Sequence, residues 1–108
     1  MRIEILYVPA CPNHRPAAER VKEALAREGL KAEIEEVVVR DHAMAEALGF
    51  PGSPTIRVDG RDVEPHSVSE TPGLACRLYR DPQSGAAGLP SVDAIRHAVR
   101  TRNAATRP

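Results

Sequence analysis

This 108-residue chain has few aromatic residues and no net charge. It has no tryptophan, one phenylalanine and two tyrosines, which is too few for a surface on which nucleic-acid bases stack. Lys and Arg together number 15, as do Asp and Glu, so no net field attracts nucleic acid or an anionic membrane. We therefore expect a protein that binds neither nucleic acid nor a membrane surface.

Long apolar runs and cysteines are few as well. No stretch approaches the roughly 20 residues that a membrane span needs, and the first residues are typical of a strand rather than of a signal peptide. The only cysteines, Cys11 and Cys76, are too few for the disulfide framework of a small secreted domain. We expect a cytoplasmic protein whose cysteines serve catalysis, soft-metal binding or simple burial.

Hydrophobic periodicity predicts an α/β domain. Apolar residues alternate near the start, helical spacing follows, and Gly29 and Gly49 are natural helix ends. The Asp59-Gly60 pair predicts a tight hairpin. The expected strands are residues 2–8, 32–39, 55–58 and 62–63, and the expected helices run from about 12 to 28, from 42 to 48 and from 92 to 102.

This order predicts an α/β sandwich of about four strands with three flanking helices. The first two strands, joined by a helix, should lie parallel, and the last two should form an antiparallel hairpin. A single domain should cover residues 1–102, followed by a flexible tail at 103–108. Residues 64–90, rich in proline and glycine, form an irregular insert that carries Cys76. We call residues 64–90 the insert.

Cys11 lies where the first strand gives way to the first helix, in the run Cys11-Pro12-Asn13-His14. A thiol at a helix N-terminus lies near free backbone N–H groups and the positive end of the macrodipole, which favour the thiolate. A thiolate is a nucleophile and a soft-metal ligand. The alternative is an inert thiol that packs as a small apolar side chain.

His14 could act on Cys11 in three ways. As an imidazolium it would favour the thiolate, as a neutral base it could take the thiol proton, and as a ligand it could share a metal with Cys11. The alternative is a first-turn histidine that faces solvent. The remaining histidines lack metal-ligand spacing, and we expect His42 and His97 on helix surfaces, with His66 in the insert.

Cys76 is the possible partner of Cys11. If the insert folds back over the helix start, Cys76 could resolve a disulfide on Cys11 or complete a two-thiolate site, provided the two Cα atoms lie within about 7 Å. Nearby Arg77 and Arg80 would favour its thiolate. The alternative is burial of Cys76 among the leucines beside it.

The chain resembles the thioredoxin-like fold superfamily through Cys11 at the end of the first strand, the Ser53-Pro54 junction before the third, and the hairpin that follows. The resemblance implies a thioredoxin-like sandwich with Pro54 in the cis form beside the reactive cysteine. It also implies that substrate binds at Pro12, Ser53 and Pro54, with the backbone of Ser53 pairing with a substrate strand. His14 stands where the family has a second cysteine, so the dithiol cycle within the motif cannot run.

Three functions remain open. The first is a thiol-dependent oxidoreductase without a cofactor, in which Cys11 attacks a thiol or disulfide substrate, a small molecule or a protein, with His14 and Cys76 assisting. The second is mercury or soft-metal binding by Cys11 and Cys76, similar in outline to alkylmercury lyase, with His14 where that enzyme has a carboxylate. The third is a non-enzymatic binding module of this fold. Packing in the core or at its rim is expected for Tyr7 and Tyr79.

Overall fold

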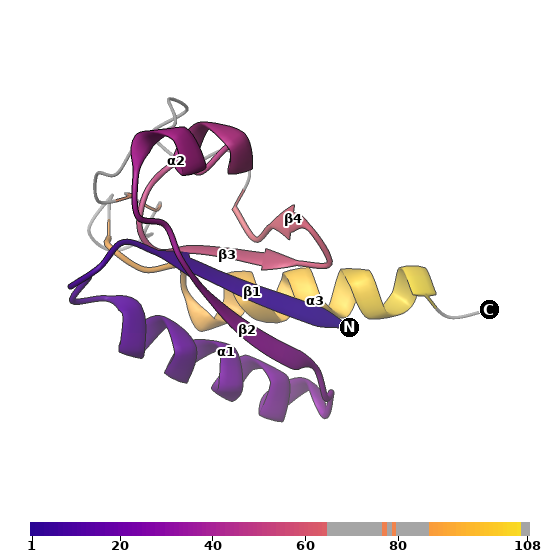
Figure 1. Ribbon diagram of the computed structural model, residues 1–108. Helices are drawn as coiled ribbons and strands as arrows, with labels where there is room; N and C mark the ends of the chain where they lie inside the picture. The colour runs from indigo at the N-terminus through magenta and orange to yellow at the C-terminus, as the bar shows by residue number, and fades with distance from the viewer. Residues whose placement is uncertain (65–76, 78, 80–86, 107–108) are drawn as a thin grey trace.

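The computed structural model describes residues 1–64, 77, 79 and 87–106. Its elements, labelled in Figure 1, are β1 (Arg2–Tyr7), α1 (His14–Glu28), β2 (Glu33–Val38), α2 (His42–Leu48), β3 (Thr55–Val58), β4 (Arg61–Asp62) and α3 (Val92–Thr106). The strands form one sheet in the order β2-β1-β3-β4. β1 and β2 run parallel, whereas β3 is antiparallel to β1 and β4. The predicted α/β architecture with a mixed sheet and three helices is confirmed.

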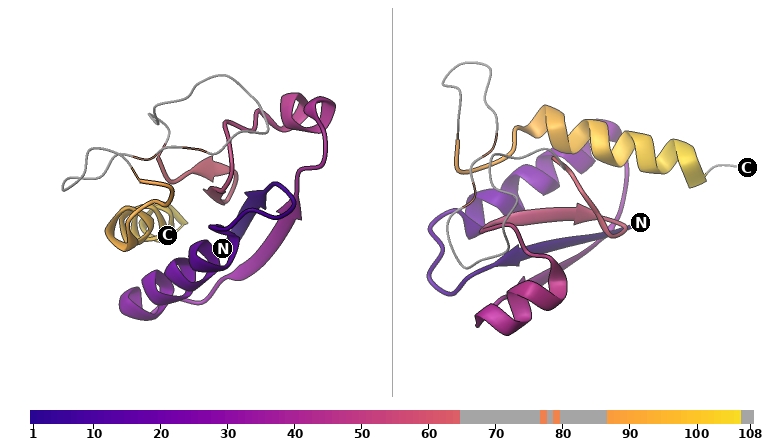
Figure 2. Two further views of the ribbon diagram at one scale, coloured as in Figure 1. Left: turned by 90° about the vertical axis from the view of Figure 1, so that its left-hand side faces the viewer. Right: turned by 90° about the horizontal axis from the view of Figure 1, so that it is seen from above.

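One face of the sheet carries α1 and α3, which lie side by side in Figure 2. Ile3 and Ile5 of β1 and Ile56 of β3 are fully buried there and pack against Val21 of α1 and Val99 of α3. Alternate residues of a strand point to the same face, so the spacing of these isoleucines accounts for the position of this core.

No helix in the described part of the chain is long and apolar enough to cross a membrane.

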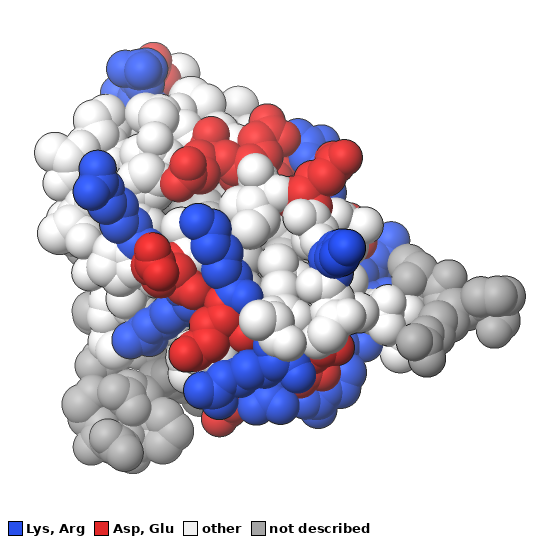
Figure 3. Space-filling view, turned by 90° about the horizontal axis from the view of Figure 1, so that it is seen from below, with Lys and Arg blue, Asp and Glu red and all other residues white. Residues whose placement is uncertain are grey.

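The other face is covered by α2 only at the end where β1 and β2 finish (Figure 1). A second, smaller core forms there from Leu6, Val39, Ala45 and Phe50. The elements therefore converge at the C-terminal end of β1, where the loop that carries Cys11 begins. On the face of the molecule shown in Figure 3, Lys and Arg are interspersed with Asp and Glu, as the balanced composition leads one to expect.

Local signals account for the short elements. Asp41 caps α2 by accepting a hydrogen bond from the backbone N–H of Met44 at 2.8 Å, and Gly49 ends the helix in the left-handed conformation. Val58 pairs with Arg61 across a two-residue connection in which Asp59 and Gly60 both have positive φ. Positive φ at both positions matches the twist of a tight hairpin, which an Asp-Gly pair adopts readily.

Two predicted boundaries need correction. α1 begins at His14 rather than near Pro12, which leaves Pro16 in the first turn. A proline is tolerated there because a backbone N–H in the first turn has no partner within the helix. α3 extends through Thr106, so the predicted tail at 103–108 begins too early. The helix continues because no proline or glycine stands between Ser91 and Thr106, and residues 104 and 105 are alanines with high helix propensity.

Glu28 joins the C-terminal end of α1 to the middle of α3. Its carboxylate accepts hydrogen bonds from Arg100 Nε at 2.9 Å and from Arg96 Nε at 2.8 Å. These hydrogen bonds, first from Arg100 and then from Arg96, lower the pKa of Glu28 to about 2. Glu28 is therefore charged in the folded protein at pH values where the unfolded chain already binds a proton.

We expect this difference to appear as acid sensitivity. A carboxyl whose pKa is lowered by folding contributes stability above its unfolded pKa, and that contribution is lost as the pH falls through the folded value, here from about pH 5 to about 2. Glu28→Gln should lower the urea midpoint at pH 7 and flatten its decline over this range. Glu23→Gln removes the same charge from the same helix, where Glu23 pairs with Arg27 along the exposed surface, and should change neither. Parallel acid profiles for the Glu28 variant and the wild type would contradict the assignment.

Candidate functional site

Cys11 lies in two consecutive turns between β1 and α1. Its N–H donates to the carbonyl of Val8 at 3.2 Å, and its own carbonyl accepts from the N–H of His14 at 3.3 Å. Ala10, just before it, has a positive φ of 62° and so takes the left-handed conformation that this sharp reversal requires. Cys11 is a free, half-buried cysteine, as a reactive thiol would need to be, rather than an inert residue of the core.

The first turn of α1 is open to a negative charge. Asn13 occupies the cap position, but its side chain makes no capping hydrogen bond, and the first turn contains no acidic residue. The first N–H groups of a helix lack partners within the helix and attract anions. Within the described part of the chain, the thiol of Cys11 makes no hydrogen bond. The N–H of His14 is bonded to the carbonyl of Cys11 and Pro16 has no N–H, so among the described residues the N–H of Arg15 is the donor of the first turn that an anion can meet.

The loop before β3 is bound to the same strand end. The Ser53-Pro54 peptide bond is cis, as the resemblance implies. Ser53 Oγ accepts a hydrogen bond from the N–H of Val8 at 3.1 Å, and the carbonyl of Val8 in turn accepts from Cys11. Two hydrogen bonds through one residue thus connect the Ser53-Pro54 loop to Cys11. The hydroxyl of Ser53 serves this connection.

Residues of the insert already occupy the carbonyls of that loop. The N–H of Arg77 donates to the carbonyl of Ser53 at 2.9 Å, and the hydroxyl of Tyr79 donates to the carbonyl of Pro54. Tyr79 is fully buried, and that burial raises the pKa of its hydroxyl. Tyr79 is thus a core residue, as expected, and these two carbonyls are bound within the chain.

Arg77 does not play the part predicted for it. Its side chain is 1% exposed and makes two hydrogen bonds to the carboxylate of Asp62, at 2.6 and 3.0 Å. It also donates to Thr55 Oγ1 and the carbonyl of Glu64, and lies 4.4 Å from the ring centre of Tyr79. Because Asp62 neutralises it, the guanidinium is not the free cation that would favour a thiolate at position 76.

The insert also returns to the start of α1. Gly88 lies so close to Asn13 that a Cβ at position 88 would be 2.5 Å from Asn13 Nδ2. The carbonyl of Pro90 accepts a hydrogen bond from Arg20 of α1 at 2.9 Å. The described residues of the insert therefore contact both the helix start and the loop before β3. Cys76 and His66 lie outside the described residues, as does Arg80.

His14 is held by two neighbours and does not face solvent freely. Its ring stacks on that of Tyr7, with the ring centres 3.6 Å apart and the planes 7° from parallel. Its Nε2 lies 2.5 Å from Oε1 of Glu36 on β2, and the His14 side chain is 23% exposed. The structure thus brings Tyr7, His14 and Glu36 together beside the turn that carries Cys11.

Glu36 is the residue that sequence reasoning missed. From the sequence, Glu36 is one of three glutamates assigned to the exposed side of the second strand. In the structure its register partner is Ile5, which faces α1. Glu36 therefore stands on the helix-covered face between Ile34 and Val38. A carboxylate at a position that the alternation reserves for an apolar residue is the signal that could have revealed it.

The described residues contain no clustered metal site. No three His, Cys, Asp or Glu side chains among them lie close enough to hold a metal ion. His42 and His97 are exposed on α2 and α3, as predicted. The two-thiolate site of the mercury hypothesis needs Cys76, which falls outside the described residues.

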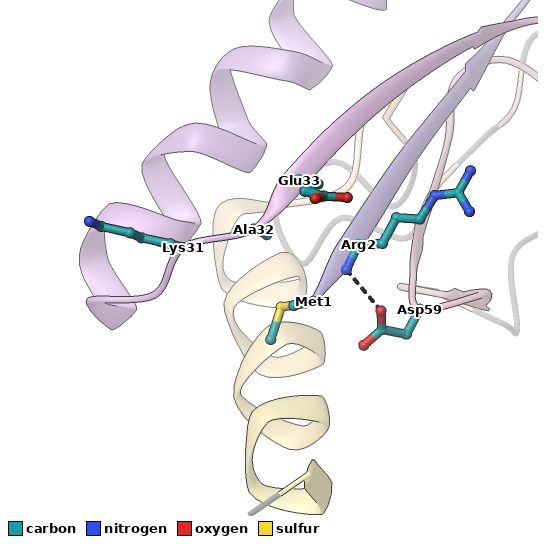
Figure 4. Close-up of a pocket in the computed structure, with 6 residues that line it drawn as sticks. All are labelled: Met1, Arg2, Lys31, Ala32, Glu33 and Asp59. Carbon is teal, nitrogen blue, oxygen red and sulfur yellow. Dashed lines mark hydrogen bonds between the residues drawn. The ribbon is translucent and has the colours of Figure 1, made fainter.

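A polar hollow of about 510 Å³ lies at the other end of the sheet, where β1 begins (Figure 4). The N–H of Arg2 donates to Asp59 across it at 2.8 Å, and Asp59 also pairs with Arg102. These contacts, led by the Arg2 N–H, lower the pKa of Asp59. Its lining residues are Met1, Arg2, Lys31, Ala32, Glu33 and Asp59. Because the hollow is wide and its charges are of both signs, the Cys11 end of the sheet remains the stronger candidate.

Comparison of the chain with protein-family models, with curated proteins and with solved structures finds no match. The function is therefore inferred from the geometry around Cys11.

Proposed function

We propose that the protein catalyses thiol–disulfide exchange, with Cys11 as the attacking sulfur. The observation that carries the proposal is the setting of this cysteine: a free, half-buried thiol on the turn that leads into a helix without a side-chain cap. The N-terminus of a helix favours negative charge on its first turn, which suits an attacking sulfur. A histidine held in place three residues later supports the same chemistry by offering a group that can exchange the thiol proton.

The reaction proceeds by successive exchange steps. The thiol proton of Cys11 moves to the His14 ring, and the thiolate attacks one sulfur of the substrate disulfide. That S–S bond breaks, a mixed disulfide forms on Cys11, and the leaving thiolate takes the proton from His14. A second thiol, from Cys76 or from an external dithiol, then attacks the Cys11 sulfur of the mixed disulfide, releases the remaining substrate thiol and leaves Cys11 in a new disulfide. The external dithiol reduces this disulfide, which frees Cys11 and leaves the dithiol itself oxidised to a disulfide. Two electrons pass from the thiol donor to the substrate disulfide, and no cofactor takes part.

His14→Ala tests whether the histidine takes part. We expect the second-order rate constant for attack of Cys11 on a peptide disulfide at neutral pH to fall by about tenfold to a hundredfold, because a positioned base contributes factors of this order or more. The release of the peptide thiol and the mass of the mixed disulfide report the rate. His42→Ala is the matched control, since His42 is also the first residue of a helix but is exposed on α2. Equal rates for wild type and His14→Ala would remove His14 from the mechanism.

Titration of the same protein with mercury(II) separates exchange from soft-metal capture. If exchange is the function, a peptide disulfide should turn over in the presence of dithiothreitol, and Cys76→Ser should retain attack by Cys11. A one-to-one mercury complex that is lost in Cys76→Ser, together with no turnover of any disulfide, would overturn the proposal in favour of a two-thiolate site.

A further inference from the structure

We infer that Glu36 is a positioning residue for His14, so that Glu36, His14 and Cys11 act as a relay in which Glu36 sets the tautomer of the imidazole. The inference rests on the proposed exchange reaction and adds a third member to its site. Its starting point is the 2.5 Å contact between Nε2 of His14 and Oε1 of Glu36, which joins α1 to β2 across 22 residues of sequence.

The contact determines which ring nitrogen carries the proton. An ionised carboxylate can only accept hydrogen bonds, so Nε2 of His14 must be the donor. In the neutral ring Nδ1 is then left with its lone pair exposed, and it makes no hydrogen bond within the described part of the chain. His14 is thereby prepared as a base at Nδ1.

The ring is also held against rotation. Tyr7 stacks on it at 3.6 Å from the strand side, and the backbone N–H of His14 is bonded to the carbonyl of Cys11. Cys11 and His14 therefore belong to one backbone turn, and the carboxylate of Glu36 holds the imidazole at Nε2 and leaves Nδ1 free. A nucleophile, a base and a third group that orients the base are the arrangement that activates a weak nucleophile.

The sign of the effect separates this role from simple electrostatics. A negative charge near Cys11 disfavours the thiolate, so removal of Glu36 by charge alone would speed the reaction of Cys11. If Glu36 positions His14 with Nδ1 as the free base, its removal must slow that reaction. A side chain that merely joins α1 to β2 would change the stability and leave both the tautomer and the rate unchanged.

Glu36→Gln tests the inference, with Glu35→Gln as the matched control. Both variants remove one negative charge from β2, and the two side chains are similarly exposed, at 47% and 51%. Glu35 pairs with Arg2 on the opposite face of the sheet, away from His14. We expect Glu36→Gln to slow alkylation of Cys11 by iodoacetamide about tenfold at neutral pH, and Glu35→Gln to leave it unchanged.

Imidazole ¹⁵N spectra of the intact protein provide the second readout. In the wild type we expect Nε2 of His14 to carry the hydrogen and Nδ1 to be unprotonated when the ring is neutral, with a mixture of both tautomers in Glu36→Gln. A wild-type ring protonated at Nδ1, or a Glu36→Gln rate equal to or above that of the wild type, would overturn the relay. The spectra do not depend on disulfide exchange, so wild-type protein that shows the expected tautomer but no exchange would overturn the proposed function and leave the assignment of Glu36 as the residue that orients His14.

Discussion

Replacing Cys11 with serine is expected to reduce disulfide exchange to the uncatalysed rate while leaving the fold intact. A serine hydroxyl without a strong base is a poor nucleophile and cannot form a mixed disulfide. Cys11 is half-buried in a turn held by backbone hydrogen bonds, so the change in the free energy of unfolding should stay within about 1 kcal/mol. Turnover of a peptide disulfide with dithiothreitol measures the activity, and urea unfolding followed by circular dichroism measures the stability.

Cys76→Ser is the matched control for this experiment, because it makes the same one-atom change at the other cysteine. If Cys76 resolves the mixed disulfide, this variant accumulates an adduct on Cys11 that mass spectrometry detects. If an external thiol resolves it, the variant keeps its turnover. Both results retain Cys11 as the attacking sulfur. Turnover that survives in Cys11→Ser would show that the proposed site is wrong.

Arg77→Met is expected to cause the largest loss of stability, about 3 kcal/mol. The substitution keeps an unbranched stem close to the length of the aliphatic part of arginine but removes the paired hydrogen bonds to Asp62. It leaves that carboxylate, 17% exposed, without its guanidinium partner. Breaking one side of a buried ion pair costs about 3–5 kcal/mol, and the partial exposure of Asp62 places this case at the lower end. Urea unfolding at neutral pH measures the loss.

Arg61→Met provides the control for Arg77. Arg61 lies beside Asp62 on β4 but is exposed, so its loss should change the free energy of unfolding by about 0.5 kcal/mol or less. A double-mutant cycle with Asp62→Asn should show a coupling energy of at least about 1 kcal/mol between Arg77 and Asp62. Equal losses for the Arg77 and Arg61 variants, or a coupling near zero, would show that the buried pair does not hold the insert on the domain.

Cys11 and Glu36 show which parts of the site the sequence pattern could predict and which it could not. The break in pattern at Cys11-Pro12 was enough to place a thiol between a strand and a helix, because strand alternation and helical spacing are local properties. The role of Glu36 was not accessible in the same way. Alternation places Glu36 on the same face as Ile34 and Val38, but only the parallel register of β2 against β1 shows that this is the face where α1 brings His14.

Arg77 is a second residue whose contacts the sequence could not predict. Its neighbourhood of prolines and glycines predicts no regular element, so its partner could not be read from spacing. In the folded chain it reaches Asp62, 15 positions earlier, and its backbone binds the carbonyl of Ser53. A guanidinium expected near a thiolate is instead committed to a carboxylate in the core.

The sequence by itself determined the order of the elements, the caps of α2, the Asp59-Gly60 hairpin and the junction that carries Cys11, because each depends on residues within a few positions of one another. The tertiary structure alone decided that His14 meets Glu36, that Arg77 is buried on Asp62, and that the insert reaches the start of α1. These contacts join residues far apart in the chain, and their partners are selected by strand register and packing rather than by any local preference.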